Sequence, residues 1–95
     1  MELRVLRYFL AVAREENITA AANSLHMTQP TLSRQLRDLE EELGQKLLIR
    51  GNHRMTLTAE GMLLRKRAEE IVAMADKTEE EFRSMKGDLS GDIYI

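Results

Sequence analysis

The sequence predicts a mainly α-helical fold made of three short helices, a two-stranded hairpin and one long helix. The 95 residues include one Pro and five Gly, so helix breakers are few, and Leu, Ala, Glu and Arg are abundant. Apolar residues recur at steps of three and four over most of the chain, but the period changes after Gly44. The first observation predicts helices, and the second places a hairpin between them.

The first helix is expected over residues 2–16. Leu3, Leu6, Leu10 and Ala13 would line its apolar face. Asn17 is expected to end this helix, because Asn tolerates the left-handed backbone conformation.

A short second helix follows, with Thr19 as its expected N-cap. Its three consecutive alanines would let a neighbouring helix approach closely. After a tight turn, the third helix is expected to begin at Thr28 and to end at Gly44. Four leucines at helical spacing would face its interior side: Leu32, Leu36, Leu39 and Leu43.

Residues 46–50 and 54–57 are typical of two short strands, joined by a turn at residues 51–53. Thr58 is expected to cap a last helix that stops at Gly87. At 1.5 Å per residue this helix would be ~40 Å long, which exceeds a small core.

The long helix carries a heptad pattern of apolar and small residues. Its first part, around Met62 and Leu63, is expected to pack on the chain's own domain, and the rest on the same helix of a second copy. The residues of this predicted dimerisation seam are Leu64, Ala68, Ile71, Ala75, Thr78, Phe82 and Met85.

Charge is unevenly distributed, although the net charge is only −2. Residues 17–37 contain two Arg and no acidic residue, and residues 43–59 contain three basic residues and again no acid. If these two windows met in space, a nearly neutral protein would present a positive face.

The order of the elements predicts a helix-turn-helix followed by a wing. In this motif the start of the second helix of the pair enters the DNA major groove, and a basic hairpin can contact the backbone or minor groove. Gln and Arg side chains suit adenine and guanine edges, and Pro and Thr can meet thymine methyls. The candidate DNA-binding residues are Thr28, Gln29, Pro30, Thr31, Ser33, Arg34 and Arg37 in the helix, and Arg50, His53 and Arg54 in the hairpin.

The sequence resembles the N-terminal region of LysR-type transcriptional regulators over about residues 3–93. The resemblance rests on the run from Thr28 to Leu43, followed by Arg50, Leu57, Thr58 and Gly61. It implies that the residues at positions 29, 30, 33 and 34 read bases. Position 53 is His where the family commonly has a wing Arg, and an unperturbed His is mostly neutral at pH 7.

The resemblance also implies a domain organisation and a setting. Residues 1–58 would form a winged helix-turn-helix, 59–87 a linker and dimerisation helix, and 88–95 the start of an effector-binding domain that lies beyond this chain. The implied partners are double-stranded DNA, a second copy (or a tetramer of the longer protein) and a small-molecule effector bound by that further domain. The implied location is the bacterial cytoplasm, in association with the nucleoid.

Other functional classes find less support in the sequence. There is no Cys, His26 and His53 are far apart, and the carboxylates of Glu40–Glu42 lack a second catalytic group, so we expect no enzyme, metal site or cofactor. No stretch approaches the ~18 apolar residues of a membrane span. The alternative is a helical protein-interaction module that dimerises through its long helix, with the basic windows incidental.

Overall fold

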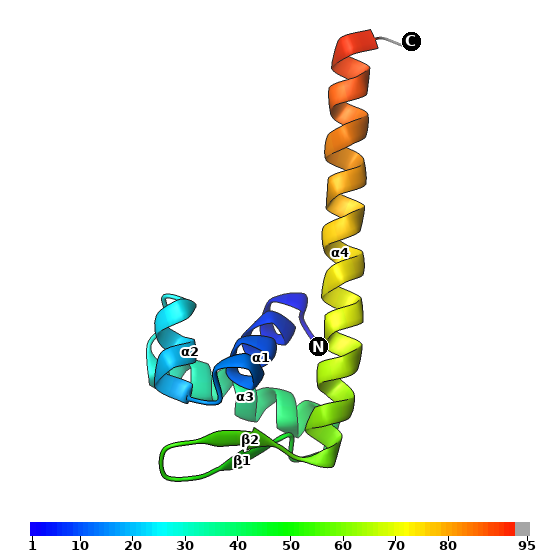
Figure 1. Cartoon of the computed structure of the whole chain (residues 1–95). Helices are drawn as coiled ribbons and strands as arrows, with labels where there is room; N and C mark the ends of the chain where they lie inside the picture. Colours follow the sequence, from blue (N-terminus) through cyan, green and yellow to red (C-terminus); the bar gives the residue numbers. More distant parts are fainter. Residues whose placement is uncertain (93–95) are drawn as a thin grey trace.

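The computed structural model describes the backbone of residues 1–92 and the side chains of residues 1–86. The elements in order are α1 (Leu3–Glu15), α2 (Ile18–Ser24), α3 (Gln29–Leu43), β1 (Leu48–Arg50), β2 (Met55–Leu57) and α4 (Ala59–Asp92). The first five elements form a small body at one end of α4, and α4 projects from this body as a long rod (Figure 1). This mainly helical fold with a two-stranded hairpin is the predicted one.

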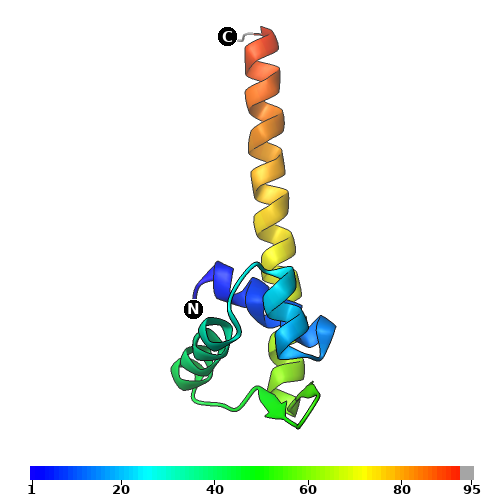
Figure 2. The same ribbon diagram turned by 90° about the vertical axis from the view of Figure 1, so that its left-hand side faces the viewer.

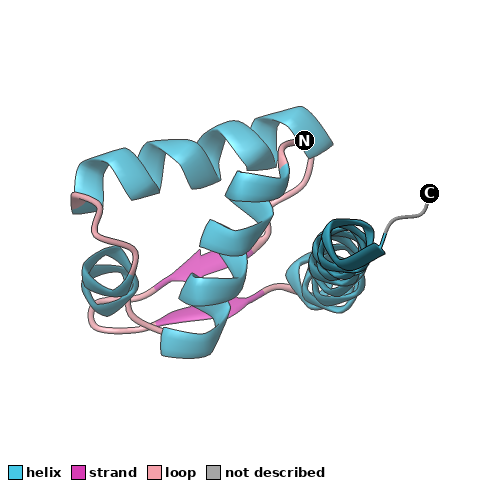
Figure 3. Cartoon of the chain, turned by 90° about the horizontal axis from the view of Figure 1, so that it is seen from above, coloured by secondary structure: helices cyan, strands magenta, loops and turns pink. Residues whose placement is uncertain are grey.

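Helix α1 lies at the centre of the body, and every other helix packs on it. Figure 3 shows α1, α2 and α3 arranged around the hairpin, with α4 seen end-on at the side. The largest fully buried side chains come from α1 and α3: Phe9, Leu6, Val12, Leu32 and Leu36. Burial of each such side chain stabilises the fold by roughly 1.5–3 kcal/mol. Ala21 and Ala22 of α2 are also buried, as the prediction of close helix approach requires.

The connection between α1 and α2 differs from the prediction. Glu16, not Asn17, takes the left-handed conformation at the end of α1, with φ 56°, and its N–H donates to the carbonyl of Val12. Asn17 instead caps α2, where its side-chain oxygen accepts from the N–H of Ala20 at 2.8 Å. The prediction that Thr19 caps α2 is therefore wrong, because Asn17 already satisfies the helix start.

Helix α3 follows the prediction closely. Thr28 is its N-cap residue, Pro30 lies in the first turn, and Gly44 closes the helix with φ 69°. The turn before it contains His26, whose φ of 58° lets the chain reverse between α2 and α3. Of the four leucines, Leu43 is the exception, since its side chain is exposed at the end of the helix while the other three are buried.

Strands β1 and β2 form a short antiparallel pair, with Leu48 opposite Leu57 and Arg50 opposite Met55. The N–H of Gly51 donates to the carbonyl of Arg54 at 2.8 Å and closes the turn. Both strands begin later than expected, at Leu48 and Met55, and the N–H of Thr58 donates to the carbonyl of Leu47 at 3.1 Å just beyond the paired residues. The hairpin thus packs against the start of α4, which it needs because an isolated two-stranded hairpin is only marginally stable in water.

The start of α4 requires Gly61. A Cβ atom at this position would lie 2.1 Å from the carbonyl oxygen of Leu47, so α4 and the chain before β1 are in direct backbone contact. The Thr58 hydroxyl accepts from the N–H of Gly61 at 2.9 Å, and this confirms Thr58 as the cap of the helix.

The path of α4 corrects two expectations. Gly87 does not end the helix, which continues to Asp92, because one Gly costs a helix only about 1 kcal/mol and no Pro follows. Residues 93–95, at the end of the segment expected to begin an effector-binding domain, lie outside the described part. Met62 and Leu63 do not pack on the body but are exposed, while Leu64 and Ala68 are buried in its core.

Candidate nucleic-acid interface

The first turn of α3 presents a polar surface. Thr28, Gln29 and Pro30 are exposed, as are Arg34 and Arg37 further along, while Thr31 and Ser33 are half-buried. Pro30, Arg34 and Arg37 lie on the side of the helix opposite the buried leucines, which fix its rotation. This turn contains no acidic residue.

The start of α3 also offers backbone donors. No side chain caps its N-terminal N–H groups, because the Thr28 hydroxyl donates to Thr31 Oγ1 at 2.8 Å instead. Uncapped N–H groups at a helix start carry partial positive charge and suit a phosphate oxygen. Thr19 of α2 donates to Gln29 Oε1 at 3.2 Å, so α2 orients the Gln29 amide. This role of Thr19 was not predicted, because the contact joins residues ten apart and Thr19 is also a common helix-cap residue.

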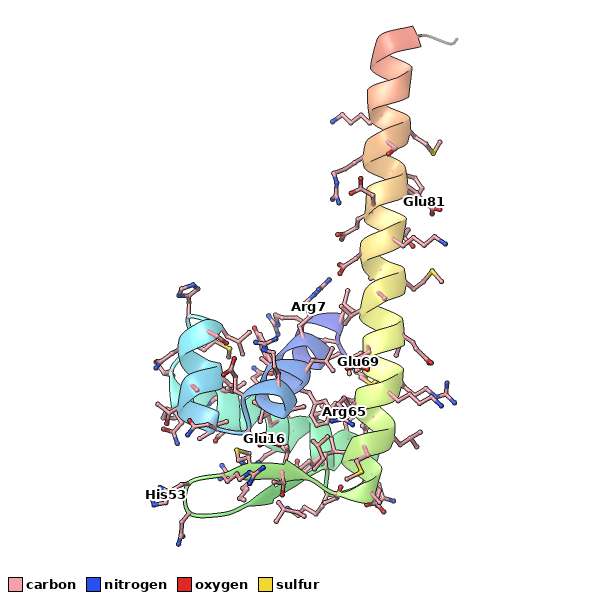
Figure 4. All side chains as sticks on the ribbon, in the orientation of Figure 1. Arg7, Glu16, His53, Arg65, Glu69 and Glu81 are labelled. Carbon is pink, nitrogen blue, oxygen red and sulfur yellow. The ribbon has the colours of Figure 1, made fainter. Side chains whose placement is uncertain are left out.

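The hairpin places its basic residues at different depths. His53 lies exposed at the tip, far from α4 (Figure 4). Arg54 is exposed but paired: its Nε and Nη2 atoms donate to Glu16 Oε1 at 3.2 and 2.8 Å. Arg50 lies deeper, with Nη2 3.7 Å from the buried Glu40. All three predicted hairpin residues therefore lie on the wing, and Arg54 is tied to the end of α1.

The two acid-free windows occupy the same end of the body. Both α2, which leads into α3, and the hairpin tip lie away from α4 in Figure 1. Figure 2 looks onto this end and shows α3 and the hairpin together on it. An exposed helix start and a basic hairpin directed to the same side match the arrangement that can contact a major groove and the adjacent backbone.

The predicted dimerisation seam is divided by the structure. Leu64 and Ala68 are buried within the chain, whereas Ile71, Thr78, Phe82 and Met85 are exposed and Ala75 is half-buried. Two further exposed residues, Leu63 and Met74, were not in the predicted seam. Leu63, Met74 and Met85 repeat every eleven residues, which is close to three helical turns, and this spacing could have identified them from the sequence.

Helix α4 is held to the body by an ion pair above the core contacts. Arg7 Nη2 of α1 lies 2.8 Å from Asp76 Oδ1, and this hydrogen bond raises the pKa of Arg7. Figure 4 shows Arg7 beside α4 near the top of the body. Beyond this point, all the described side chains of residues 77–86 are exposed.

The described part of the chain shows neither a metal-binding cluster nor a membrane-spanning helix. Among the described side chains of residues 1–86, no three from His, Cys, Asp or Glu gather in a way that could hold a metal ion. None of the described helices has the length and hydropathy needed to span a membrane.

The fold and this surface define a winged helix-turn-helix domain, with α3 as the recognition helix and the hairpin as the wing. Comparison with known families agrees with this assignment of a helix-turn-helix domain. The model of the family "Bacterial regulatory helix-turn-helix protein, lysR family" matches residues 3–62. The chain belongs to this family, as the resemblance predicted.

Individual relatives give the same result. The chain is 45% identical over 96 residues to the HTH-type transcriptional regulator BsdA of Bacillus subtilis. The match covers 100% of this chain but 33% of BsdA. The chain matches the DNA-binding domain of BenM in complex with benA site 1 DNA with a TM-score of 0.85, at 42% identity over 90% of this chain and 99% of that one. It also matches the CbnR DNA-binding domain in its DNA complex, with a TM-score of 0.86 and 40% identity over 90% of this chain and 99% of that one. The chain thus spans about a third of the length of BsdA.

Proposed function

We propose that this chain is the DNA-binding part of a transcriptional regulator. The start of α3 enters the major groove, and the wing lies on the backbone or in the minor groove. The observation that carries the proposal is the exposed, uncapped and acid-free first turn of α3, directed to the same end of the body as the basic hairpin. DNA complexes of the similar BenM and CbnR domains support it.

The candidate residues divide into two roles. Gln29, Pro30, Ser33 and Arg34 lie where base edges would be read, with Thr28 and Thr31 beside them. Arg37, Arg50, His53 and Arg54 lie further along α3 or on the wing and would neutralise phosphates. Base contacts give sequence preference, whereas phosphate contacts give affinity that falls with salt.

A binding titration with mixed-sequence duplex DNA tests the proposal. We expect salt-sensitive binding, with log K falling linearly as log salt concentration rises. A helical protein-interaction module with incidental basic windows would show no binding even at low salt, and that result would refute the proposal.

We propose further that the chain acts as a homodimer through α4. The exposed apolar residues of this helix form a stripe over the part that no other described element covers, namely Leu63, Ile71, Met74, Thr78, Phe82 and Met85, with Ala75 at its border. Phe82 is 65% exposed, an unfavourable state for a side chain that gains roughly 2 kcal/mol on burial. Leu64 and Ala68 take no part, because the body already buries them.

The base of the stripe adds a second argument for this partner. A shallow apolar groove of about 400 Å³ lies between the end of α3 and α4, with Met1, Leu43 and Leu63 among its lining residues. Leu63 belongs both to the groove and to the exposed apolar residues of α4. The exposed ion pair of Arg67 and Glu70, at 2.9 Å, lies between Leu63 and Ile71 on the helix, so a second copy would meet two apolar patches with charged residues between them.

Sedimentation of the Phe82→Glu variant tests the dimer. We expect a shift from dimer to monomer, since a charge would be placed in the apolar stripe. Arg83→Glu is the control, because it introduces the same side chain about 100° around the helix, away from the stripe centre. Equal dissociation of both variants, or of neither, would contradict the proposed interface.

The remaining parts of the proposal concern the longer protein. The linker helix would extend from residue 59 at least to Asp92, past the boundary expected at residue 87. A small-molecule effector would bind a further C-terminal domain, and a tetramer would form at that level. The place of action would be the bacterial cytoplasm, on the nucleoid. Limited proteolysis of the longer protein tests the boundary, which should lie beyond Asp92.

A further inference from the structure

Glu40 is a buried acidic residue at the junction of the recognition helix and the wing. Its side chain is 5% exposed. One carboxylate oxygen, Oε2, accepts from the backbone N–H groups of Leu47 and Leu48 at 2.8 and 3.2 Å. The backbone carbonyl of Glu40 also accepts from the N–H of Gln45. A single residue of α3 therefore fixes the path of the chain into β1.

The second carboxylate oxygen has a different environment. Glu40 Oε1 is buried and accepts no hydrogen bond from the described residues. Its cationic neighbour is Arg50 of β1, whose Nη2 atom lies 3.7 Å away. This distance is too long for a hydrogen bond but short enough for strong attraction between opposite charges. A buried carboxylate oxygen without a hydrogen bond lowers the stability of the fold, so we looked for a function that Glu40 would serve at this place.

The geometry leaves the donors of Arg50 available. Its guanidinium makes no hydrogen bond to the side chains or backbone that the structure describes, and about a third of the side chain is exposed. Arg54 contrasts with it, because two of its donor atoms are engaged by Glu16. Arg50 is thus attracted to a fixed place while its N–H groups stay able to bind a phosphate.

The position of Glu40 on α3 brings this pair close to the DNA side. At 100° per residue, Glu40 lies about 60° around the helix from Arg37, between the polar face and the buried leucines. The guanidinium of Arg50 lies 3.7 Å from Glu40, and so at the border of the polar face in the last turns of α3. A phosphate contacting the wing root would approach it there.

We propose that Glu40 is a positioning residue for DNA binding, which sets the wing root against α3 and holds the Arg50 guanidinium ready for a phosphate. The inference rests on the proposed DNA-binding function. Its physical basis is preorganisation: a side chain that is already ordered loses less freedom when it binds.

A double-mutant cycle on the full chain tests the proposal, with a mixed-sequence DNA duplex as the probe. Glu40→Gln keeps an oxygen for the Leu47 and Leu48 N–H groups but removes the charge that attracts Arg50. We expect Arg50→Ala to weaken binding about tenfold and Glu40→Gln about threefold to tenfold, each lowering the salt slope by about one. The double variant should bind no more weakly than Arg50→Ala alone.

The matched control repeats the cycle with Arg54. Because Glu16 and not Glu40 holds Arg54, the effects of Glu40→Gln and Arg54→Ala should multiply. A purely structural role would make Glu40→Gln equally harmful in the Arg50→Ala and Arg54→Ala backgrounds, and that result would overturn the proposal. Tighter DNA binding by Glu40→Gln would also overturn it, because Glu40 would then compete with the phosphate.

A second measurement needs no variant. In the free protein, the NMR order parameter of the Arg50 Nε–H should exceed that of Arg34, which is exposed. Equal disorder of the two side chains would contradict the proposed positioning even if Glu40→Gln failed to fold. Failure of the unaltered chain to bind DNA would instead refute the proposed function itself.

Discussion

Gly61→Ala tests whether the wing and the linker helix are held together by a backbone contact that only glycine permits. The added Cβ would lie 2.1 Å from the carbonyl oxygen of Leu47 and 3.1 Å from its carbonyl carbon. Real Cβ atoms stay at least 3.0 Å from such atoms, so the two segments must separate by about 1 Å. Both are backbone, and no flexible side chain can move away to absorb the change.

The energy follows from the contacts at this junction. Separation strains the bonds from Thr58 N–H to Leu47 O, at 3.1 Å, and from Leu47 N–H to Glu40 Oε2, at 2.8 Å. Each is worth about 1 kcal/mol net, and overpacking itself costs about 1–3 kcal/mol. Alanine favours the helix by up to about 1 kcal/mol over glycine. The net expected loss is about 3 kcal/mol, so the steric effect exceeds the gain in helix propensity.

Urea unfolding followed by circular dichroism measures this loss, which should lower the midpoint by about 2 M for a small domain. Gly44→Ala is the control, because a Cβ there meets nothing within 4 Å and only the positive φ of 69° opposes it. That variant should lose about 1 kcal/mol. If Gly61→Ala were as stable as the unaltered chain, or more so, the argument from close backbone approach would be refuted.

Three further changes test other parts of the account. Arg34→Ala should cost ~1–3 kcal/mol of specific DNA binding and relax base preference at one position in a selection experiment, and uniform weakening would contradict a reading role. Arg54→Ala should weaken all sequences alike and lower the salt slope by about one, yet change unfolding by less than about 1 kcal/mol because its pair with Glu16 is exposed. Asn17→Ala should destabilise the chain by about 1 kcal/mol in urea unfolding, whereas Thr19→Ala should cost less, because Asn17 is the cap.

The sequence predicted those parts of the fold that depend on local signals. Three of the four leucines of α3, the glycine at its end and the cap at Thr58 were predicted, because periodicity and capping preferences act within a few residues. The exposure of Pro30 and Arg34 follows from the same periodicity, because each lies about 160° around the helix from the buried Leu32. Periodicity does not explain Gln29, which lies at nearly the same angle as Leu36 and is exposed at the start of the helix.

Other features depend on which neighbour a residue meets. Asn17 and Thr19 are both good caps, and the sequence alone does not decide between them. The apolar pattern of α4 shows that one face is buried but not what covers it, so Leu64 was assigned to a second copy although it belongs to the core of this chain. The bond between Glu40 and the backbone before β1 crosses seven residues and a turn. Periodicity does not predict such a contact, and Glu40 was considered only as one of the carboxylates of residues 40–42 that lack a second catalytic group.

Contact of DNA with the first turn of α3 and the hairpin is tested most directly by an NMR titration of the isotope-labelled chain with duplex DNA. We expect the backbone amide signals of residues 28–37 and 50–54 to shift most, and those of the exposed half of α4 to shift least. Shifts confined to α4, or no shifts at low salt, would contradict it.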